Sequence, residues 1–178
     1  MTLATLTPRS RPTANLADAG SWPITHLDHR GSEWSDESYR KFRVPLGRAD
    51  VLIETTREAL PDWLVSVLRK LNEIAALPGN WDSYGAAPVD QRSLEHSLEL
   101  ILKIMEDNEM LPPPRVSATV RGGVGFEWRS EGKDLEIELE GPFRVHAYFF
   151  DEHSGEEWED DVGIDLGALD PYLARMAD

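Results

Sequence analysis

The hydrophobic period of this sequence changes at one proline-rich segment, LPPPR at residues 111–115, and this change constrains the fold more than any other feature. Before the segment, apolar residues recur every three or four positions, which is the spacing of one face of an α-helix. After it, apolar and polar residues alternate, which is typical of a half-buried β-strand. Proline cannot continue a helix and favours extended chain before it. The sequence therefore predicts helices first and a sheet second.

Two helices are expected before the proline-rich segment, over about residues 61–77 and 91–107. Pro61 suits the first turn of a helix, where its missing N–H is not needed, and Asp90 is a favourable N-cap for the second helix. Each helix has one apolar stripe: Trp63, Leu64, Val67, Leu68, Leu71, Ile74 and Ala75 in the first, and Leu94, Leu98, Ile101, Leu102 and Met105 in the second.

Four strands are expected after the segment, within about residues 116–150, with glycines at the turns between them. A register with three cross-strand pairs keeps all apolar residues on one face, whereas a one-residue slip would reverse every side chain. These pairs are Val120 with Val124, Trp128 with Leu135, and Leu139 with Val145. The sequence thus predicts an α+β, two-layer domain: a four-stranded antiparallel meander packed on the two helices, followed by a short C-terminal helix.

The expected domain organisation is a flexible tail over residues 1–20, a docking arm over residues 21–49 and a single α+β domain over residues 50–178. The tail is small, polar and non-periodic, whereas the arm is too apolar for a solvated linker. Residues 51–56, VLIETT, are rich in β-branched side chains and predict a further strand. A length of 178 residues suits one domain with a substantial core.

The composition excludes several classes of function. The chain has no cysteine, which excludes disulfides, thiolate metal sites and cysteine nucleophiles. Its net charge is −15, and residues 131–165 hold thirteen Asp or Glu against only Lys133 and Arg144. A field of this sign repels a phosphate backbone, so direct binding of nucleic acid is not expected. No apolar run is long enough for a membrane helix, and a cytoplasmic protein is expected.

The outer face of the meander is the first candidate site. The register places Glu127 opposite Glu136, Glu138 opposite His146, and Tyr148 opposite Glu136. Two carboxylates that face each other across strands repel, which raises the pKa of one of them. Such a pair can serve as an acid/base pair or as part of an oxygen-rich metal site. The alternative is a solvated acidic face with no chemistry.

The loop between the two helices, LPGNWDSYGAAPVD at residues 77–90, is the second candidate. Trp81 and Tyr84 can stack a ligand, and Asp82 can act as an acid or base. The favoured interpretation is a structural hinge formed by Trp81, Asp82, Tyr84 and Gly85. In such a hinge, large aromatic residues cap the core, Asp82 accepts from nearby backbone N–H groups and Gly85 supplies a positive φ.

The other candidate motifs do not fit a known site. The acidic run DEHSGEEWEDD at residues 151–161 lacks the regular ligand alternation of a calcium loop. HLDH at residues 26–29 has no standard zinc spacing. GGVG at residues 122–125 is followed by a strand, whereas a phosphate loop needs a helix N-terminus there. We therefore expect no catalytic residue, no metal and no cofactor.

Several segments are similar to those of a group of small bacterial proteins. The shared motifs are W-D-x-Y-G-A, a proline-led strand, G-G-x-x-x-E-W and L-E-I-E, and the similarity covers about residues 64–160. The residues that fit are Trp81, Asp82, Tyr84, Gly85, Ala86, Gly122, Gly123, Glu127 and Trp128. The resemblance implies a defined fold and a setting near toxin–antitoxin or defence genes, but it implies no activity and no catalytic residue.

These observations favour a non-enzymatic, acidic interaction protein, similar to an antitoxin, immunity protein or inhibitor. Its expected partner is a basic protein such as a toxin or a nucleic-acid enzyme. The expected partner-binding residues are Glu127, Glu136, Glu138, His146, Tyr148 and Glu157. Two alternatives stay open: a nucleic-acid-mimicking inhibitor of a DNA- or RNA-binding enzyme, and a carboxylate-dependent hydrolase that uses Glu127, Glu136 and His146. The first needs regularly spaced carboxylates, and the second needs a concave pocket.

Overall fold

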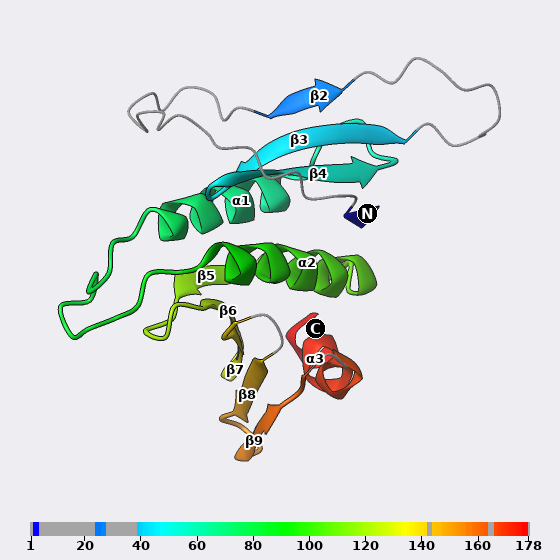
Figure 1. Ribbon diagram of the computed structural model, residues 1–178. Helices are drawn as coiled ribbons and strands as arrows, with labels where there is room; N and C mark the ends of the chain where they lie inside the picture. The colour runs from blue at the N-terminus through cyan, green and yellow to red at the C-terminus, as the bar shows by residue number, and fades with distance from the viewer. Residues whose placement is uncertain (1, 4–23, 28–38, 142–143, 164–165, 178) are drawn as a thin grey trace. The chain divides into compact units, whose positions relative to one another are not determined.

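The structure is a computed structural model in which the chain forms two compact units, residues 1–73 and 74–178. Both units combine helices with antiparallel sheet, which confirms the predicted α+β class (Figure 1). Most of the predicted tail and arm lie outside the described residues. The structure describes residues 2–3, 24–27, 39–141, 144–163 and 166–177.

The first unit is built on a hairpin of two seven-residue strands, β3 (Arg40–Leu46) and β4 (Ala49–Thr55). β4 contains most of the strand predicted at residues 51–56. Two short strands flank the hairpin, β1 (Thr2–Leu3) beside β4 and β2 (Thr25–Leu27) beside β3. Leu46 pairs with Ala49, so the predicted boundary between arm and domain falls inside the hairpin.

Helix α1 (Asp62–Ala75) is held to the turn of this hairpin by one side chain, that of Asn72. Its amide nitrogen donates to the carbonyl of Pro45 at 2.9 Å, and its Oδ1 accepts from the backbone N–H of Gly47 at 2.9 Å. Gly47 has a φ of 59°, so the turn has a conformation that favours glycine. The predicted apolar stripe of this helix is buried at Leu64, Val67, Leu68, Leu71 and Ile74.

We predict that Asn72→Ala lowers the free energy of unfolding by about 1–3 kcal/mol, because the partly buried partners at Pro45 and Gly47 lose their hydrogen bonds. Denaturant unfolding measures this effect. Glu73→Ala is the matched control on the same helix, since Glu73 is exposed and, among the described residues, pairs only with Lys70. Its expected effect is below about 0.5 kcal/mol. Equal effects of the two substitutions would contradict the role of Asn72.

The second unit begins with helix α2 (Gln91–Asp107), which has the predicted bounds. Asp90 caps its N-terminus as expected: its carboxylate accepts from the backbone N–H of Ser93 at 2.9 Å and from the Ser93 hydroxyl at 2.8 Å. The chain ends in a 3₁₀ turn, η1 (Leu166–Leu169), and helix α3 (Asp170–Ala177), which confirms the predicted short C-terminal helix. None of the helices in the described part of the chain has the length and apolarity needed to cross a membrane.

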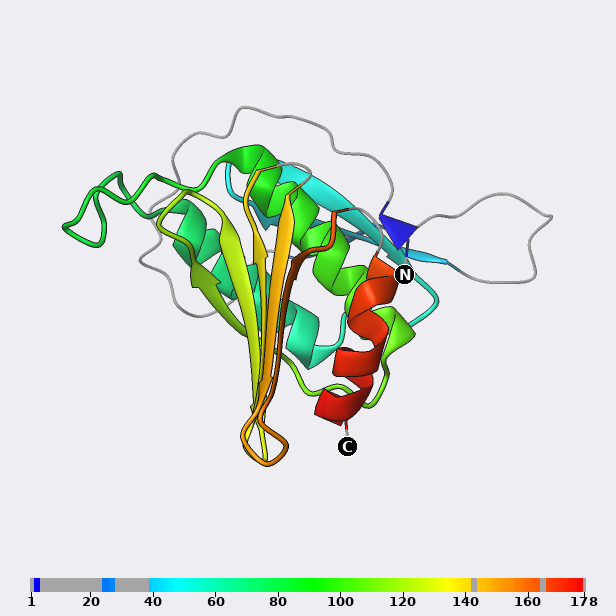
Figure 2. The same cartoon turned by 90° about the horizontal axis from the view of Figure 1, so that it is seen from below.

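Five antiparallel strands in sequential order form the sheet of this unit (Figure 2). The predicted meander of four strands over 116–150 is therefore one strand short. The strands are β5 (Arg115–Ala118), β6 (Val124–Ser130), β7 (Lys133–Leu139), β8 (Val145–Asp151) and β9 (Glu156–Asp161).

The missed strand, β9, has the sequence EEWEDD. Its residues are exposed apart from Trp158, so it lacks the alternation of apolar and polar residues that predicts a strand. Tertiary contacts hold it instead, and two of them involve its whole length or its one apolar side chain. All six of its residues pair with β8, and Trp158 stacks on Tyr172 of α3 with ring centroids 4.4 Å apart. Neither contact is visible as a local pattern in the sequence.

Two of the three predicted cross-strand pairs are confirmed: Trp128 lies opposite Leu135, and Leu139 lies opposite Val145. The pairing of Val120 with Val124 is wrong, because Ala118 is the partner of Val124. The turn is two residues longer than predicted, since Thr119 closes it by accepting at its hydroxyl from the N–H of Gly123 at 3.0 Å. A shift of two residues keeps the side chains of the paired residues on their predicted faces. Val120 itself lies in the turn, with 59% of its surface exposed, and is not on the apolar face as predicted.

Helices α2 and α3 contact β6 and β7 on the apolar face of the sheet, where Trp128, Leu135, Ile137 and Phe149 are fully buried. The Trp128 indole N–H donates to the carbonyl of Pro112 at 2.8 Å, so the proline-rich segment is fastened to the sheet that follows it. Of the two helices predicted to cover the sheet, α2 does so, and α3 is a second cover that was not predicted. The packing of the helix at 61–77 on this sheet stays a prediction, since α1 belongs largely to the other unit.

Candidate interaction surface

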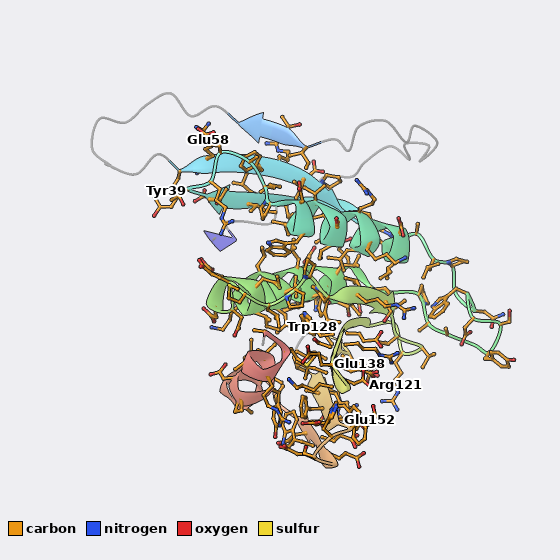
Figure 3. The ribbon with its side chains drawn as sticks, turned by 180° about the vertical axis from the view of Figure 1, so that it is seen from behind. Tyr39, Glu58, Arg121, Trp128, Glu138 and Glu152 are labelled. Carbon is orange, nitrogen blue, oxygen red and sulfur yellow. The ribbon has the colours of Figure 1, made fainter. Side chains whose placement is uncertain are left out.

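The face of the five-stranded sheet opposite α2 and α3 carries most of the charged side chains of its strands. We call its carboxylates the acidic face; Figure 3 labels Glu138 among them. The strand register places on this one face Glu127, Asp134, Glu136, Glu138, Glu157, Glu159 and Asp161. Glu140, just beyond β7, joins them through Arg144, which pairs with both Glu140 and Asp161. The basic side chains that accompany them are Arg115, Arg129, Arg144 and His146. Carboxylates thus outnumber arginines on this surface.

The predicted neighbours on this face are confirmed by the strand pairing. Glu127 lies opposite Glu136, Glu136 opposite Tyr148, and Glu138 opposite His146. Tyr148 in turn lies opposite Glu159 of β9, which extends the row across the sheet to its edge. Glu157 also lies on this face, opposite Phe150. All six residues predicted to bind a partner therefore share one surface, while their role in binding stays a prediction.

Glu136 is at the centre of a group of like charges. Burial raises the pKa of its carboxyl above the ordinary value, and the charge of Glu127 opposite adds to the shift. The positive charge of Arg129 lowers the pKa of Glu136, but this arginine is shared among three carboxylates. Its guanidinium lies 2.6 Å from Glu127, 3.0 Å from Asp134 and 3.9 Å from Glu136. The repulsion between the facing carboxylates therefore remains incompletely neutralised.

We predict that Glu136→Gln raises the free energy of unfolding at neutral pH, because it removes the repulsion between Glu136 and Glu127. The expected increase is about 0.2–1 kcal/mol, the usual energy of one cross-strand side-chain pair. Because the pKa of Glu136 is raised in the folded state, the folded protein binds this proton more tightly than the unfolded chain. The wild-type protein is then relatively destabilised as the pH rises through that pKa, and the difference between the two proteins should shrink as the pH falls towards about 4.

Denaturant unfolding of both proteins across this pH range measures the effect. Glu99→Gln, which removes one charge from an exposed position of α2, controls for the change in net charge. A Glu136→Gln variant that is less stable than the wild type at neutral pH would show that Glu136 is stabilising.

His146 lies between two carboxylates of the edge strand. Its Nε2 is 3.1 Å from Glu159, and its Nδ1 is 3.2 Å from Asp161. Both nitrogens can donate only in the imidazolium form. Glu138, opposite His146, forms no hydrogen bond or ion pair with any of the described residues. Burial raises the pKa of the neighbouring Tyr148 phenol, and the charge of Glu157 adds to that shift.

Glu140 differs from the other carboxylates of the face because two arginines neutralise it. Arg121, in the turn between β5 and β6, reaches it at 3.0 Å, and Arg144 lies 3.8 Å away (Figure 3). Its side chain is also less exposed than those of Asp134 and Glu136, with 14% of its surface exposed. Glu140 therefore adds less net negative charge to the face than carboxylates without an arginine partner.

Several members of this surface were not predicted as site residues. Arg129, Asp134, Glu159 and Asp161 belong to it, and the two acidic residues of β9 continue the alternation that begins at Glu157. The available signal in the sequence was that Glu159 and Asp161 follow Glu157 at every second position, because every second side chain of a strand lies on the same face. No group of three or more His, Asp and Glu side chains is arranged to hold a metal ion in the part of the chain that the structure describes.

Two acidic residues of the same segment have a different partner and do not belong to the acidic face. Arg175 of α3 forms a short, charge-assisted hydrogen bond to Asp151 and donates to Glu156 at 2.6 Å. Its guanidinium also lies 4.5 Å from the centre of the Phe149 ring. Lys133 donates to the carbonyl of Arg175 at 3.0 Å. These contacts fasten α3 to the ends of β7, β8 and β9.

The loop at residues 77–90 is held by hydrogen bonds within itself. Oδ1 of Asp82 accepts from the backbone N–H groups of Tyr84 at 2.8 Å and Ala86 at 3.0 Å. These bonds, that from Ala86 first, hold the pKa of the Asp82 carboxyl below its ordinary value. Gly85 has a φ of 100°, as the hinge interpretation requires. Tyr84 does not cap the core, because 94% of its surface is exposed.

Trp81 is only partly buried, although its indole nitrogen is shielded from solvent and has no hydrogen-bond partner among the described residues. The backbone of the loop also reaches the sheet, since Ala87 donates to the carbonyl of Val120 at 2.9 Å. Tyr84 is therefore exposed on a loop whose backbone is hydrogen-bonded both to the Asp82 side chain within the loop and to Val120 next to the sheet. The assignment of the loop as a structural hinge stays a prediction.

We predict that Asp82→Ala increases amide hydrogen exchange at Tyr84 and Ala86, because both N–H groups lose their acceptor. Asp82→Asn is the matched control, since its side-chain oxygen can still accept both bonds. In the wild type, a lowered folded-state pKa means that the carboxylate stabilises the loop above its ordinary pKa, and this contribution is lost as the pH falls through the lowered value. Equal exchange in the wild type and in Asp82→Ala would contradict the assignment.

No protein-family model matches this chain, and comparisons with curated proteins and with solved structures likewise find no match. The similarity to a group of small bacterial proteins remains a resemblance in sequence motifs. The proposals below therefore depend on the chain's own charges and geometry.

Proposed function

We propose that this protein is a non-enzymatic interaction protein, similar to an antitoxin, immunity protein or inhibitor, whose acidic face binds a basic protein partner. The observation that carries the proposal is the confinement of the net charge to one unit. Residues 74–178 hold 23 acidic and 8 basic side chains, whereas residues 1–73 hold 10 of each. The whole formal charge of −15 therefore belongs to the unit that contains the acidic face.

The arrangement of the charges supports binding. Core-facing apolar residues hold the strands in register, so the outward side chains project from a fixed framework. Glu138 has no ion pair with any residue that the structure describes, and the phenol of Tyr148 and the ring of Phe150 add aromatic surface between the carboxylates. Clustered charge of one sign also steers an oppositely charged partner into the encounter, which raises the association rate.

The charge also limits the kind of partner. A surface with this excess of carboxylates repels a phosphate backbone, so the proposal is a protein partner rich in Lys and Arg. Among such partners are proteins whose own ligand is a nucleic acid, since their binding sites are basic. The proposal does not depend on any reaction at Glu136 or His146.

We predict that reversing Glu136, Glu138 and Glu157 together to Lys weakens binding of the partner at least about tenfold, because like charges in an interface repel. The partner is isolated by affinity purification from the native host at low salt, and its affinity is then measured with both purified proteins. Binding to the wild type should weaken as salt rises, mainly through slower association, since screening at physiological salt acts within about 8 Å.

The control is a second triple variant that makes the same change in net charge away from the acidic face. Glu99, Glu106 and Glu109 lie exposed on and after α2, and their joint reversal to Lys should leave the affinity within about threefold of the wild type. The melting temperature of each variant reports whether it is folded. If both triple variants bind like the wild type, the acidic face is not the binding surface and serves solubility.

A further inference from the structure

The five-stranded sheet ends in two edges of different character. β5 forms one edge with four residues and directly follows the prolines at 112–114, which have no N–H to donate. β9 forms the other edge with six residues and contains neither glycine nor proline. Among the described residues, no strand pairs with β9 on the side away from β8. An unpaired, regular strand of this length is a template for an additional strand.

The hydrogen-bond pattern shows which groups of β9 face outward. Val162, just beyond the strand, donates to the carbonyl of Val145 at 2.9 Å, and bonding positions alternate along an antiparallel pair. Residues 156, 158 and 160 therefore bond to β8, and residues 157, 159 and 161 direct their N–H and C=O groups away from it. The N–H of Asp161 is occupied by the side chain of Asp160 at 2.8 Å. Those of Glu157 and Glu159 face the open edge.

The side chains of β9 define what an added strand must carry. Glu157, Glu159 and Asp161 all point to the acidic face, and along a strand they are about 7 Å apart. A strand with Lys or Arg at every second position would place its cations beside them. On the other face of β9, Trp158 is partly exposed where it stacks on Tyr172, and it offers an apolar contact to the intervening positions.

We propose that β9 is the docking edge for an extended segment of the partner in which Lys or Arg alternates with apolar residues, bound by β-strand addition. This inference rests on the proposed function and names its binding mode. Main-chain hydrogen bonds supply affinity in this mode, and the alternating side chains supply specificity. A second copy of this chain is not the occupant, because two acidic edges repel each other.

The experiment compares two variants that differ in one N–H. Glu159→Gln and Glu159→Pro both remove the same charge, but only proline also removes an outward-facing N–H. That N–H is not bonded to β8, and edge positions of this kind tolerate proline. The probe is a short synthetic peptide of alternating Lys and Val. We expect it to bind the proline variant at least about tenfold more weakly than the glutamine variant, because strand pairing is interrupted.

A second experiment uses the wild-type protein and changes the peptide instead. The same peptide, N-methylated at the residues whose N–H groups would face β9, keeps its charge but loses the hydrogen bonds. It should bind the wild-type protein at least about tenfold more weakly than the unmodified peptide. In the wild type, the unmodified peptide should also slow amide exchange at Glu157 and Glu159.

The outcomes separate this inference from the proposed function. If the two peptides bind equally, or if the proline and glutamine variants bind the peptide equally, strand addition is wrong. If, in addition, the reversal of Glu136, Glu138 and Glu157 still weakens the natural partner, the acidic face binds it without strand addition. If the peptide slows exchange at Glu157 and Glu159 while both triple variants bind the natural partner like the wild type, the edge binds basic strands but the proposed function fails.

Discussion

The pairing of β6 with β7 is the constraint on which the rest of the second unit depends. With Trp128 opposite Leu135, the apolar residues of both strands share the face that α2 and α3 cover. The same register necessarily puts Glu127 opposite Glu136 on the other face, because successive side chains point in opposite directions. Burial raises the pKa of Glu136, and the repulsion by Glu127 that adds to this shift is a consequence of the pairing that forms the core. A slip of one residue would bury the carboxylates and expose the apolar set.

The acidic residues of the C-terminal half have two separate roles. Asp151 and Glu156 hold Arg175 and so fasten α3 to the sheet, whereas Glu157 and Glu159 project from the same hairpin towards solvent. Alternation along β9 separates the two sets, since Glu156 and Trp158 face α3 while their neighbours face outward. A charge count along the sequence cannot distinguish them, although one set contacts α3 and the other lies on the acidic face.

Much of the second unit could be predicted because its local signals agree with its tertiary structure. The stripe of α2, the cap at Asp90 and the alternation of Leu135, Ile137 and Leu139 each indicate the element that forms. The predictions that were wrong or incomplete have physical reasons. β9 has one apolar residue and is held by β8 and Tyr172, which lie elsewhere in the chain. The predicted partner of Val120 is wrong because the side-chain hydrogen bond of Thr119 closes a longer turn. Tyr84 is exposed, although an aromatic residue in this loop was expected to cap the core.

The sequence by itself determined the α+β class, the bounds of α2 and the face on which Glu127, Glu136 and Glu138 lie, because periodicity and alternation are local properties of the chain. Only the tertiary structure decided that a fifth, acidic strand forms the edge of the sheet, that Arg129 is shared among three carboxylates and that Glu138 has no ion pair with the described residues. These features depend on which residues meet across strands and between a strand and α3. Such contacts join positions far apart in the chain, and no local pattern records them.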